Sequence, residues 1–193
     1  FFSESTRQQN PSDTFHLGYV GRLLWMKGVD LLVEAVKQNE GIRLTLIGSG
    51  EYENELRNRI AELNLRERIE IIPAVPEDTV VERMRSFDAL VLPSRTTAGW
   101  KEQLGRVLIE AMALGIPAIG SRCGAIPEVL GRNDLVFEEE NTKELSNILN
   151  RLQTDSDWRR EIVEYGRQRA KERFTWEAFA NRVGEFYRRL ELL

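Results

Sequence analysis

Residues 100–115 read WKEQLGRVLIEAMALG and hold the most informative local pattern of the chain. From Arg106 onward the stretch consists of good helix formers without Gly or Pro, and Gly115, followed by Pro117, would end the helix. Gly105 separates this apolar run from the polar residues before it. We therefore expect a loop that passes into a helix near Gly105.

Two carboxylates flank the expected start of this helix. Glu102 would lie in the loop just before the N-terminus, and Glu110 about one turn inside. Unpaired backbone N–H groups and the positive end of the helix dipole attract anions to such a place. Carboxylates accept hydrogen bonds from hydroxyl groups. The stretch therefore suits a ligand with both phosphate and hydroxyl groups, such as a nucleotide sugar.

A simpler interpretation exists for Glu110. It could form an ion pair with Arg106, one turn earlier on a helix surface, which would be worth only about a few tenths of a kcal/mol. However, its other neighbours in sequence are apolar, and a carboxylate in apolar surroundings is costly unless it is bonded. We therefore favour the ligand-binding interpretation of the two carboxylates.

Segments typical of strands and helices alternate along the chain. The expected strands are 15–20, 42–47, 68–72, 88–92, 117–120 and 134–137. The expected helices are 29–38, 51–63, a segment capped by Asp78 or Thr79 and ending near 86, 105–114, 126–130, 141–152, 156–171 and 175–192. This order predicts an α/β fold, a Rossmann-like doubly wound and mostly parallel sheet flanked by helices, with extra C-terminal helices. In such folds ligands bind beyond the carboxyl ends of the strands.

Composition excludes several classes of protein. The chain has 193 residues, enough for one domain with a full core, and its net charge of −4 comes from interspersed charges, so we expect no nucleic-acid partner. It holds one cysteine, Cys123, and one histidine, His16, so neither a disulfide nor a histidine metal site is expected. No apolar run is long enough to span a membrane. We expect a cytoplasmic protein, and leave open a peripheral association of the full-length protein with membranes.

The loop 21–28 follows the first expected strand and is bounded by glycines. Arg22 offers a planar fork of donors and Lys27 a mobile point charge, and both suit a diphosphate. The alternative is a pair of solvated surface cations on a glycine-containing turn. The loop alone does not decide between these interpretations.

Loops after the next strands add candidates. Gly48 and Gly50 form a G-x-G, but Glu53 stands where the dinucleotide motif needs a third glycine, so we infer only a close backbone approach to a ligand or helix. Ala74 and Val75 could wall a planar base or simply connect two elements. The polar loop 94–99 suits a substrate loop, and 121–128 is a turn with no assigned role.

Two other features resemble sites but have simpler explanations. The segment 155–157, DSD, has the D-x-D pattern of a metal site, yet Asp and Ser are preferred at helix starts, so we interpret it as a cap. Cys123 has no histidine nearby in sequence, which disfavours a thiol nucleophile.

Several short motifs occur in one order between residues 15 and 130. They are Gly21-Arg22 with Lys27-Gly28, Gly48-x-Gly50, Pro93-Ser94, the E-x7-E of Glu102 and Glu110, and Gly115-x-Pro117. Together they resemble the C-terminal, donor-binding domain of the retaining GT-B glycosyltransferases of group 1 (family 4), and the segment 174–177, FTWE, is also similar. The resemblance implies transfer of a sugar from a nucleoside-diphosphate sugar to an acceptor, with retention of configuration and without a metal or other cofactor.

The resemblance also implies roles for the matching residues. Arg22 and Lys27 would hold the donor diphosphate, Glu102 would contact the transferred sugar, and these three form the expected catalytic set. Glu110 would bind the ribose hydroxyls. The other implied contacts come from loop glycines, the base loop and backbone amides: Gly21, Gly48, Gly50, Ala74, Val75, Gln103, Leu104, Gly105, Arg106 and Val107.

The chain also departs from the family pattern. Pro73 stands where Gly is usual, which puts the base-loop contacts in question, and Ala125 replaces a frequent Gly. Residues 1–14 resemble an inter-domain linker and 15–193 the nucleotide-sugar-binding domain, with 174–193 as its terminal helix. The acceptor would be bound by an N-terminal domain that this sequence does not contain, so we expect the chain alone to bind nucleotide and turn over little.

Two other function classes are weighed against a transferase. The domain could be a nucleotide-binding or regulatory module without transfer activity. A Rossmann dehydrogenase is disfavoured by the interrupted G-x-G-x-x-G pattern.

Overall fold

The computed structural model describes residues 14–189. Its strands are β1 (Phe15–Val20), β2 (Ile42–Ile47), β3 (Ile69–Ile72), β4 (Ala89–Leu92), β5 (Ala118–Ser121) and β6 (Val136–Phe137). Its helices are α1 (Val29–Gln38), α2 (Glu53–Glu62), α3 (Glu77–Met84), α4 (Arg106–Leu114), α5 (Ile126–Leu130), α6 (Thr142–Thr154), α7 (Ser156–Phe174) and α8 (Trp176–Arg189), with the 3-10 turns η1 (Trp25–Lys27) and η2 (Asn133–Leu135).

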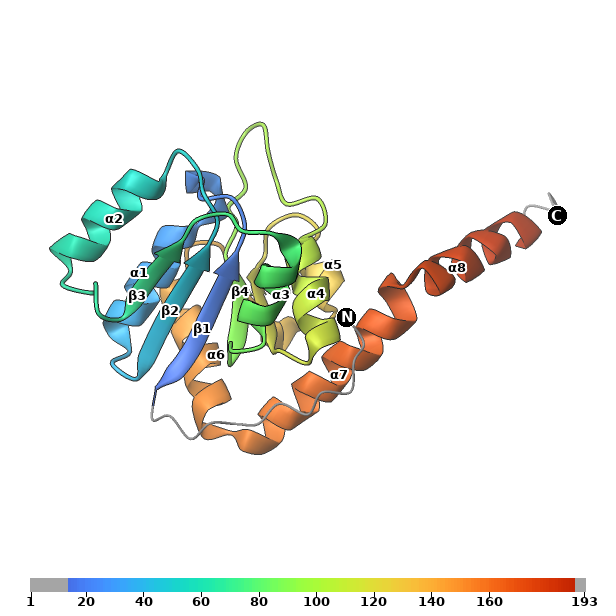
Figure 1. Ribbon diagram of the computed structural model, residues 1–193. Coiled ribbons are helices and arrows are strands. Elements are labelled where there is room, and N and C mark those ends of the chain that lie inside the picture. Colours follow the sequence, from blue (N-terminus) through green and yellow to red (C-terminus); the bar gives the residue numbers. More distant parts are fainter. Residues whose placement is uncertain (1–13, 190–193) are drawn as a thin grey trace.

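All six strands are parallel and lie in the order β3-β2-β1-β4-β5-β6. Helices α1 and α6 contact each other on one face of this sheet, and α4 and α7 contact each other on the opposite face (Figure 1). Every residue of β4 is buried, as expected for a strand covered on both faces. The predicted Rossmann-like fold is confirmed.

The sheet order reverses between β1 and β4, which pair with each other in its centre. Residues of β1 and β2 pair without offset, from Phe15 opposite Ile42 to Val20 opposite Ile47. The loops that follow the two strands therefore begin side by side. The N–H of Gly21 donates to the carbonyl of Ile47 at 3.0 Å. This edge of the sheet, where the carboxyl ends of parallel strands meet, is where ligands bind in such folds.

The predicted N-terminal cap of the third helix, Asp78 or Thr79, was wrong. Helix α3 begins at Glu77, directly after Pro76, and no side chain caps it. Neither Asp78 nor Thr79 is therefore the cap, and Asp78 lies in the first turn, where a negative charge interacts favourably with the helix dipole. The carbonyl of Pro76 accepts the first helical hydrogen bond, from Val80 at 3.0 Å.

Most other predicted boundaries lie within three residues of the observed ones, and those of β1, β2, α1 and α5 coincide with them. The clearest exception is the predicted strand 134–137, whose first half forms η2 so that only Val136–Phe137 pairs with β5. At the start of α6, Asn141 accepts from the N–H of Glu144 at 3.1 Å, but the Glu144 carboxylate bonds the N–H of Glu138 instead of completing a capping box. The Asp155 side chain caps α7 through the N–H of Trp158 at 2.9 Å, as predicted.

Helix α8 extends away from the body of the molecule (Figure 1). None of its described residues is buried. Large apolar side chains are exposed on it, namely Trp176, Phe179, Phe186 and Tyr187. Residues 190–193 of the predicted terminal helix and 1–13 of the predicted leader lie outside the described part of the chain.

Candidate functional site

A largely buried ion pair lies at the carboxyl edge of the sheet and joins two of the predicted site residues. Lys27, at the end of η1, approaches Glu102 with 2.7 Å between Nζ and Oε2. Their side chains are only 18% and 11% exposed. The Ser94 hydroxyl donates to the same oxygen, Oε2, at 2.9 Å. The Lys27 ammonium also lies 4.6 Å from the centre of the Trp100 ring. The structure therefore brings together a cation and a carboxylate that stand 75 positions apart in sequence.

Gly28 lets the loop after β1 approach the loop after β4. It has φ +69, and a Cβ there would lie 1.9 Å from the carbonyl oxygen of Pro93, at the end of β4. Only glycine fits such a contact without moving the backbone. Gly124 does the same on the other side, where a Cβ would lie 2.0 Å from the carbonyl of Glu102. The loop that carries Glu102 is thus packed between two other loops at this edge.

Helix α4 begins beside Glu102, as predicted. Gly105 precedes it with φ +68, and no side chain caps this N-terminus. The first turn therefore has backbone N–H groups for which the helix supplies no partner, and these suit an anion. Gly105 itself is buried, whereas Gln103, Leu104 and Arg106 are exposed.

Glu110 occupies a half-buried position in α4. It pairs with Arg106, with 2.8 Å between Oε1 and the guanidinium Nε, so the simpler interpretation of this pair does occur. The Arg106 side chain is 76% exposed, however, and an ion pair with so exposed a partner adds little stability. Burial raises the pKa of Glu110, the Arg106 guanidinium opposes that rise, and the charge of Glu77 adds to it.

Five predicted residues share a pocket of about 300 Å³ beyond β1, β2 and β3. It is lined by Val20, Gly21, Arg22, Ile47, Gly48, Ser49, Ala74, Val75 and Val80. The exposed Arg22 side chain gives the pocket a cation, and Val75 and Val80 give it apolar surface. Despite Pro73, the loop of Ala74 and Val75 reaches this pocket, and the Ala74 N–H donates to Ser49 Oγ at 3.2 Å.

Gly48 and Gly50 allow close backbone approach, but to a neighbouring loop rather than to a helix. A Cβ on Gly48 would lie 1.9 Å from the carbonyl oxygen of Gly21, and one on Gly50 would lie 2.2 Å from that of Leu23. These two glycines therefore let the second loop pack against the first, and Gly48 also lines the pocket.

Comparison with known proteins identifies the family. The family described as "Glycosyl transferases group 1" matches residues 2–169. The chain belongs to this family. The group 1 domain is 32% identical over 174 residues to an uncharacterized glycosyltransferase of Methanocaldococcus jannaschii, covering 89% of this chain and 47% of that protein. The chain spans about half the length of the curated relatives it matches.

Solved structures agree with the family. HepE of Anabaena in complex with UDP-glucose has a TM-score of 0.79 and 26% identity, over 90% of the group 1 domain and 48% of that chain. The C-terminal domain of the group 1 protein LpcC from Francisella tularensis has a TM-score of 0.72 at 22% identity, over 84% of this chain and 87% of that one, and shows the same fold. The predicted C-terminal GT-B domain is confirmed, whereas its assignment to family 4 stays a prediction.

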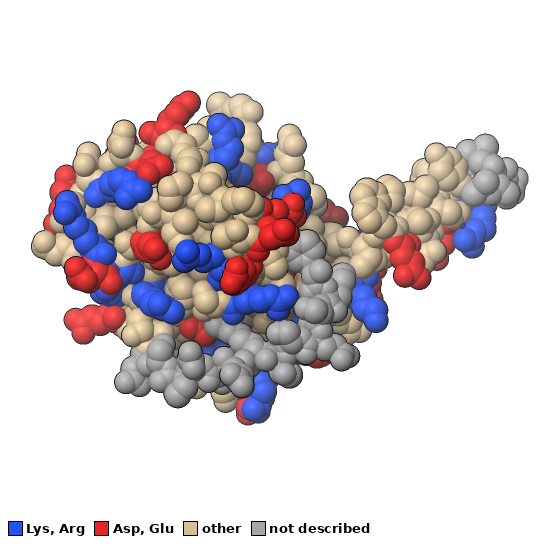
Figure 2. Space-filling view, in the orientation of Figure 1, with Lys and Arg blue, Asp and Glu red and all other residues tan. Residues whose placement is uncertain are grey.

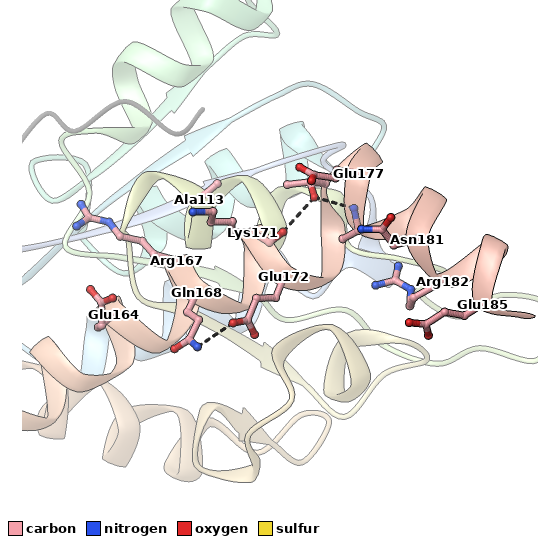
Figure 3. A pocket seen from close by; sticks show the side chains of 12 residues that line it. Ala113, Glu164, Arg167, Gln168, Lys171, Glu172, Glu177, Asn181, Arg182 and Glu185 are labelled. Carbon is pink, nitrogen blue, oxygen red and sulfur yellow. Dashed lines mark hydrogen bonds between the residues drawn. The ribbon is translucent and has the colours of Figure 1, made fainter.

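A larger hollow of about 900 Å³ lies between α7 and α8, with Ala113 of α4 at its side (Figure 3). Charged side chains of both signs line it, including Lys171, Arg182 and Glu185. It contains none of the predicted site residues and lies away from the loops that hold Lys27 and Glu102. The carboxyl edge, which holds the predicted residues, therefore stays the candidate site of the group 1 domain.

The sequence did not single out several residues that support the site. Arg95 was treated only as part of the polar loop 94–99, Trp100 only as the start of the stretch 100–115, and Ser94 only as part of that loop and of the Pro93-Ser94 motif. Cys123 was set aside as a nucleophile, yet its Sγ lies 3.5 Å from the backbone nitrogen of Glu102. Burial raises the pKa of this thiol. The Pro93-Ser94 pair was the one available signal for Ser94, because a polar residue two positions after a fully buried parallel strand lies at the edge where ligands bind.

Other expectations concern metals, membranes and nucleic acids. Residues 14–189 contain no group of three or more His, Cys, Asp or Glu side chains that could hold a metal ion. None of the helices in that range is long and apolar enough to cross a membrane. Figure 2 shows Lys, Arg, Asp and Glu interspersed over the visible face rather than gathered by sign.

Proposed function

We propose that this chain is the donor-binding half of a retaining, metal-independent glycosyltransferase of family 4. The enzyme would transfer a hexosyl group from a nucleoside-diphosphate sugar to an acceptor. The observation that carries the proposal is the Lys27–Glu102 pair beside the uncapped start of α4, next to the pocket that holds Arg22. Support also comes from the family and from the UDP-glucose complex of HepE.

The leaving group of this reaction is a nucleoside diphosphate, which carries negative charge as the bond to the sugar breaks. Lys27, Arg22 and the N–H groups of residues 103–107 at the start of α4 would stabilise that charge. The Lys27 ammonium has three donors, so it can bind a phosphate oxygen while it stays next to Glu102. Positive charge develops on the sugar, and the nearby Glu102 carboxylate favours it.

Glu102 is suited to orient the sugar. Lys27 and Ser94 both bond its Oε2. The second carboxylate oxygen would accept a hydrogen bond from a sugar hydroxyl. Glu110 would accept the ribose hydroxyls, with Arg106 releasing it. Ala74 and Val75 would border the base in the pocket beyond β3. We assign no general base or covalent nucleophile to this chain.

The acceptor would be held by a second domain, since relatives are about twice as long as this chain. The isolated chain would then bind donor but transfer little. Calorimetric titration with UDP, GDP, ADP and NAD, each with and without EDTA, tests the proposal. We expect one nucleoside diphosphate to bind, and EDTA to leave its affinity unchanged. Binding of NAD without any nucleoside diphosphate would overturn the transferase assignment.

A further inference from the structure

Arg95 is a buried cation directly after Ser94, at the end of β4, and only 5% of it is exposed. Its guanidinium bonds Asp30 of α1 through both carboxylate oxygens, Nη1 to Oδ1 at 2.7 Å and Nη2 to Oδ2 at 2.6 Å. Nη1 also donates to the carbonyl of Trp25 at 2.8 Å, and Nε to Glu140 at 3.0 Å. The guanidinium carbon lies 5.0 Å from the centre of the Trp25 ring. One side chain therefore joins η1, α1 and the segment after β6.

These contacts connect the two loops that carry Lys27 and Glu102. Trp25 lies in the same 3-10 turn as Lys27, and the Arg95 N–H donates to the carbonyl of Met26 at 2.8 Å. Arg95 itself opens the loop that leads to Glu102. We propose that Arg95 is a positioning residue of the donor site, which fixes η1 against the β4–α4 loop and so sets the separation of Lys27 and Glu102. The inference rests on the proposed function, because it assigns the geometry of that same site.

The segment after β6 reinforces the arrangement. Glu139 binds Thr96, the residue after Arg95. Its carboxylate accepts from the Thr96 N–H at 2.7 Å and from the Thr96 hydroxyl at 2.5 Å. Glu140 reaches Arg95 from a backbone with φ +64, which is uncommon for a residue other than glycine. Burial disfavours the charged guanidinium, but Asp30 and Glu140 outweigh that effect and raise the pKa of Arg95 further. The cation is thus permanent at neutral pH.

Lysine cannot replace these contacts, because it is a point charge without the planar fork that bonds both oxygens of Asp30. Arg95→Lys should keep the charge and let η1 move relative to the loop. A shift of about 1 Å in a binding group can reduce function about a hundredfold.

The chain offers a matched control in Arg132. It also bonds both oxygens of one aspartate, Asp134, at 2.9 and 2.6 Å, and a single oxygen of a glutamate, Glu161, at 2.5 Å. Its guanidinium lies 5.3 Å from an aromatic ring, that of Tyr165. Arg132 precedes β6, so it lies at the amino edge of the sheet, opposite the site. Arg132→Lys therefore loses the same kinds of contact away from Lys27 and Glu102.

The experiment compares the two variants in the full chain. Thermal unfolding measures stability, and calorimetry measures the affinity for UDP and UDP-glucose, or for the GDP or ADP pair if that base binds. We expect both variants to lose stability, and only Arg95→Lys to weaken nucleotide-sugar binding, by about tenfold or more. A second readout is the indole N–H resonance of Trp100, which lies under Lys27. It should shift in Arg95→Lys and not in Arg132→Lys.

Each outcome separates this inference from the proposed function. A folded Arg95→Lys chain with wild-type affinities and an unmoved Trp100 signal would overturn the positioning role. If the wild type binds no nucleotide, the proposed function fails, and the Trp100 signal still decides whether Arg95 sets the geometry around Lys27. If Arg95→Lys does not fold, Asp30→Asn compared with Asp134→Asn asks the same question with a milder change, and equal effects of those two on Trp100 would contradict the inference.

Discussion

Glu110 combines partial burial with an exposed partner, Arg106, and it is the residue to which the ribose is assigned. We expect Glu110→Gln to weaken binding of the nucleoside diphosphate by about 1–3 kcal/mol, because a charged acceptor of two hydroxyl protons is lost. Isothermal titration measures this effect. The exposed carboxylate of Glu62 provides the control variant, Glu62→Gln, whose affinity should not change. Unchanged affinity in a folded Glu110→Gln chain would reduce Glu110 to a partner of Arg106.

Glu110 should also make nucleotide binding depend on pH. Burial raises the pKa of Glu110 above its ordinary value of 4.5, so the carboxylate takes up a proton at a higher pH than an exposed glutamate does. The ionised form accepts the ribose hydroxyls, and nucleotide affinity should therefore fall as the pH drops through this raised pKa. The Glu110→Gln chain should lack that component. Titrations repeated between neutral and acidic pH compare the two slopes.

Glu102 is assigned to the sugar and not to the nucleotide. Glu102→Gln should weaken UDP-glucose binding, or that of the matching sugar nucleotide, by about tenfold while UDP binds as well as before or better. The physical reason is that Lys27 loses its charged partner and becomes more available to the diphosphate. The ratio of the two dissociation constants is the measurement. An equal loss for UDP and UDP-glucose would place Glu102 at the nucleotide instead.

At the scale of elements, the end of α4 depends on Gly115. Gly115 has φ +72. Its N–H donates to the carbonyl of Met112, and the N–H of Ile116 donates to the carbonyl of Ala111. These two hydrogen bonds form a Schellman motif. We expect Gly115→Ala to lower the free energy of unfolding by about 1–2 kcal/mol, because an L side chain is strained in this conformation and its Cβ would lie 2.4 Å from Nε of Arg167, which would have to move. Gly99 has no heavy atom within 4 Å of a built Cβ, so Gly99→Ala should be nearly neutral. Urea denaturation compares the two, and equal effects would contradict the role of the left-handed turn.

At the scale of the whole molecule, α8 contributes contacts to α7 but no buried residue among those described. A chain that ends at Thr175 should therefore keep its free energy of unfolding within about 1 kcal/mol of the full chain. It should also self-associate less, because the exposed aromatic side chains of α8 are removed. Urea denaturation and analytical ultracentrifugation measure these two effects. A loss of several kcal/mol would show that α8 is part of the cooperative core.

The sequence by itself determined the order of elements and the parallel sheet, and it predicted the edge at which we propose the site. Apolar periodicity, glycines and prolines act locally, so β1, β2, α1 and α4 were predicted within one residue at each end. The motifs along the chain also predicted that Lys27, Glu102 and Glu110 belong to a single site, and the structure brings Lys27 and Glu102 together. The α3 cap was misjudged because Pro76 starts that helix without a polar side chain.

Only the tertiary structure decided which of these residues meet. The Lys27–Glu102 pair, the bond from Ser94 and the contacts of Arg95 join segments far apart in sequence. They depend on backbone approaches at Gly28 and Gly124 that no local pattern specifies. A side chain's charge and size are local properties, whereas its partner is set by how loops pack at the edge of the sheet. For that reason the roles of Ser94 and Arg95 became visible only in three dimensions.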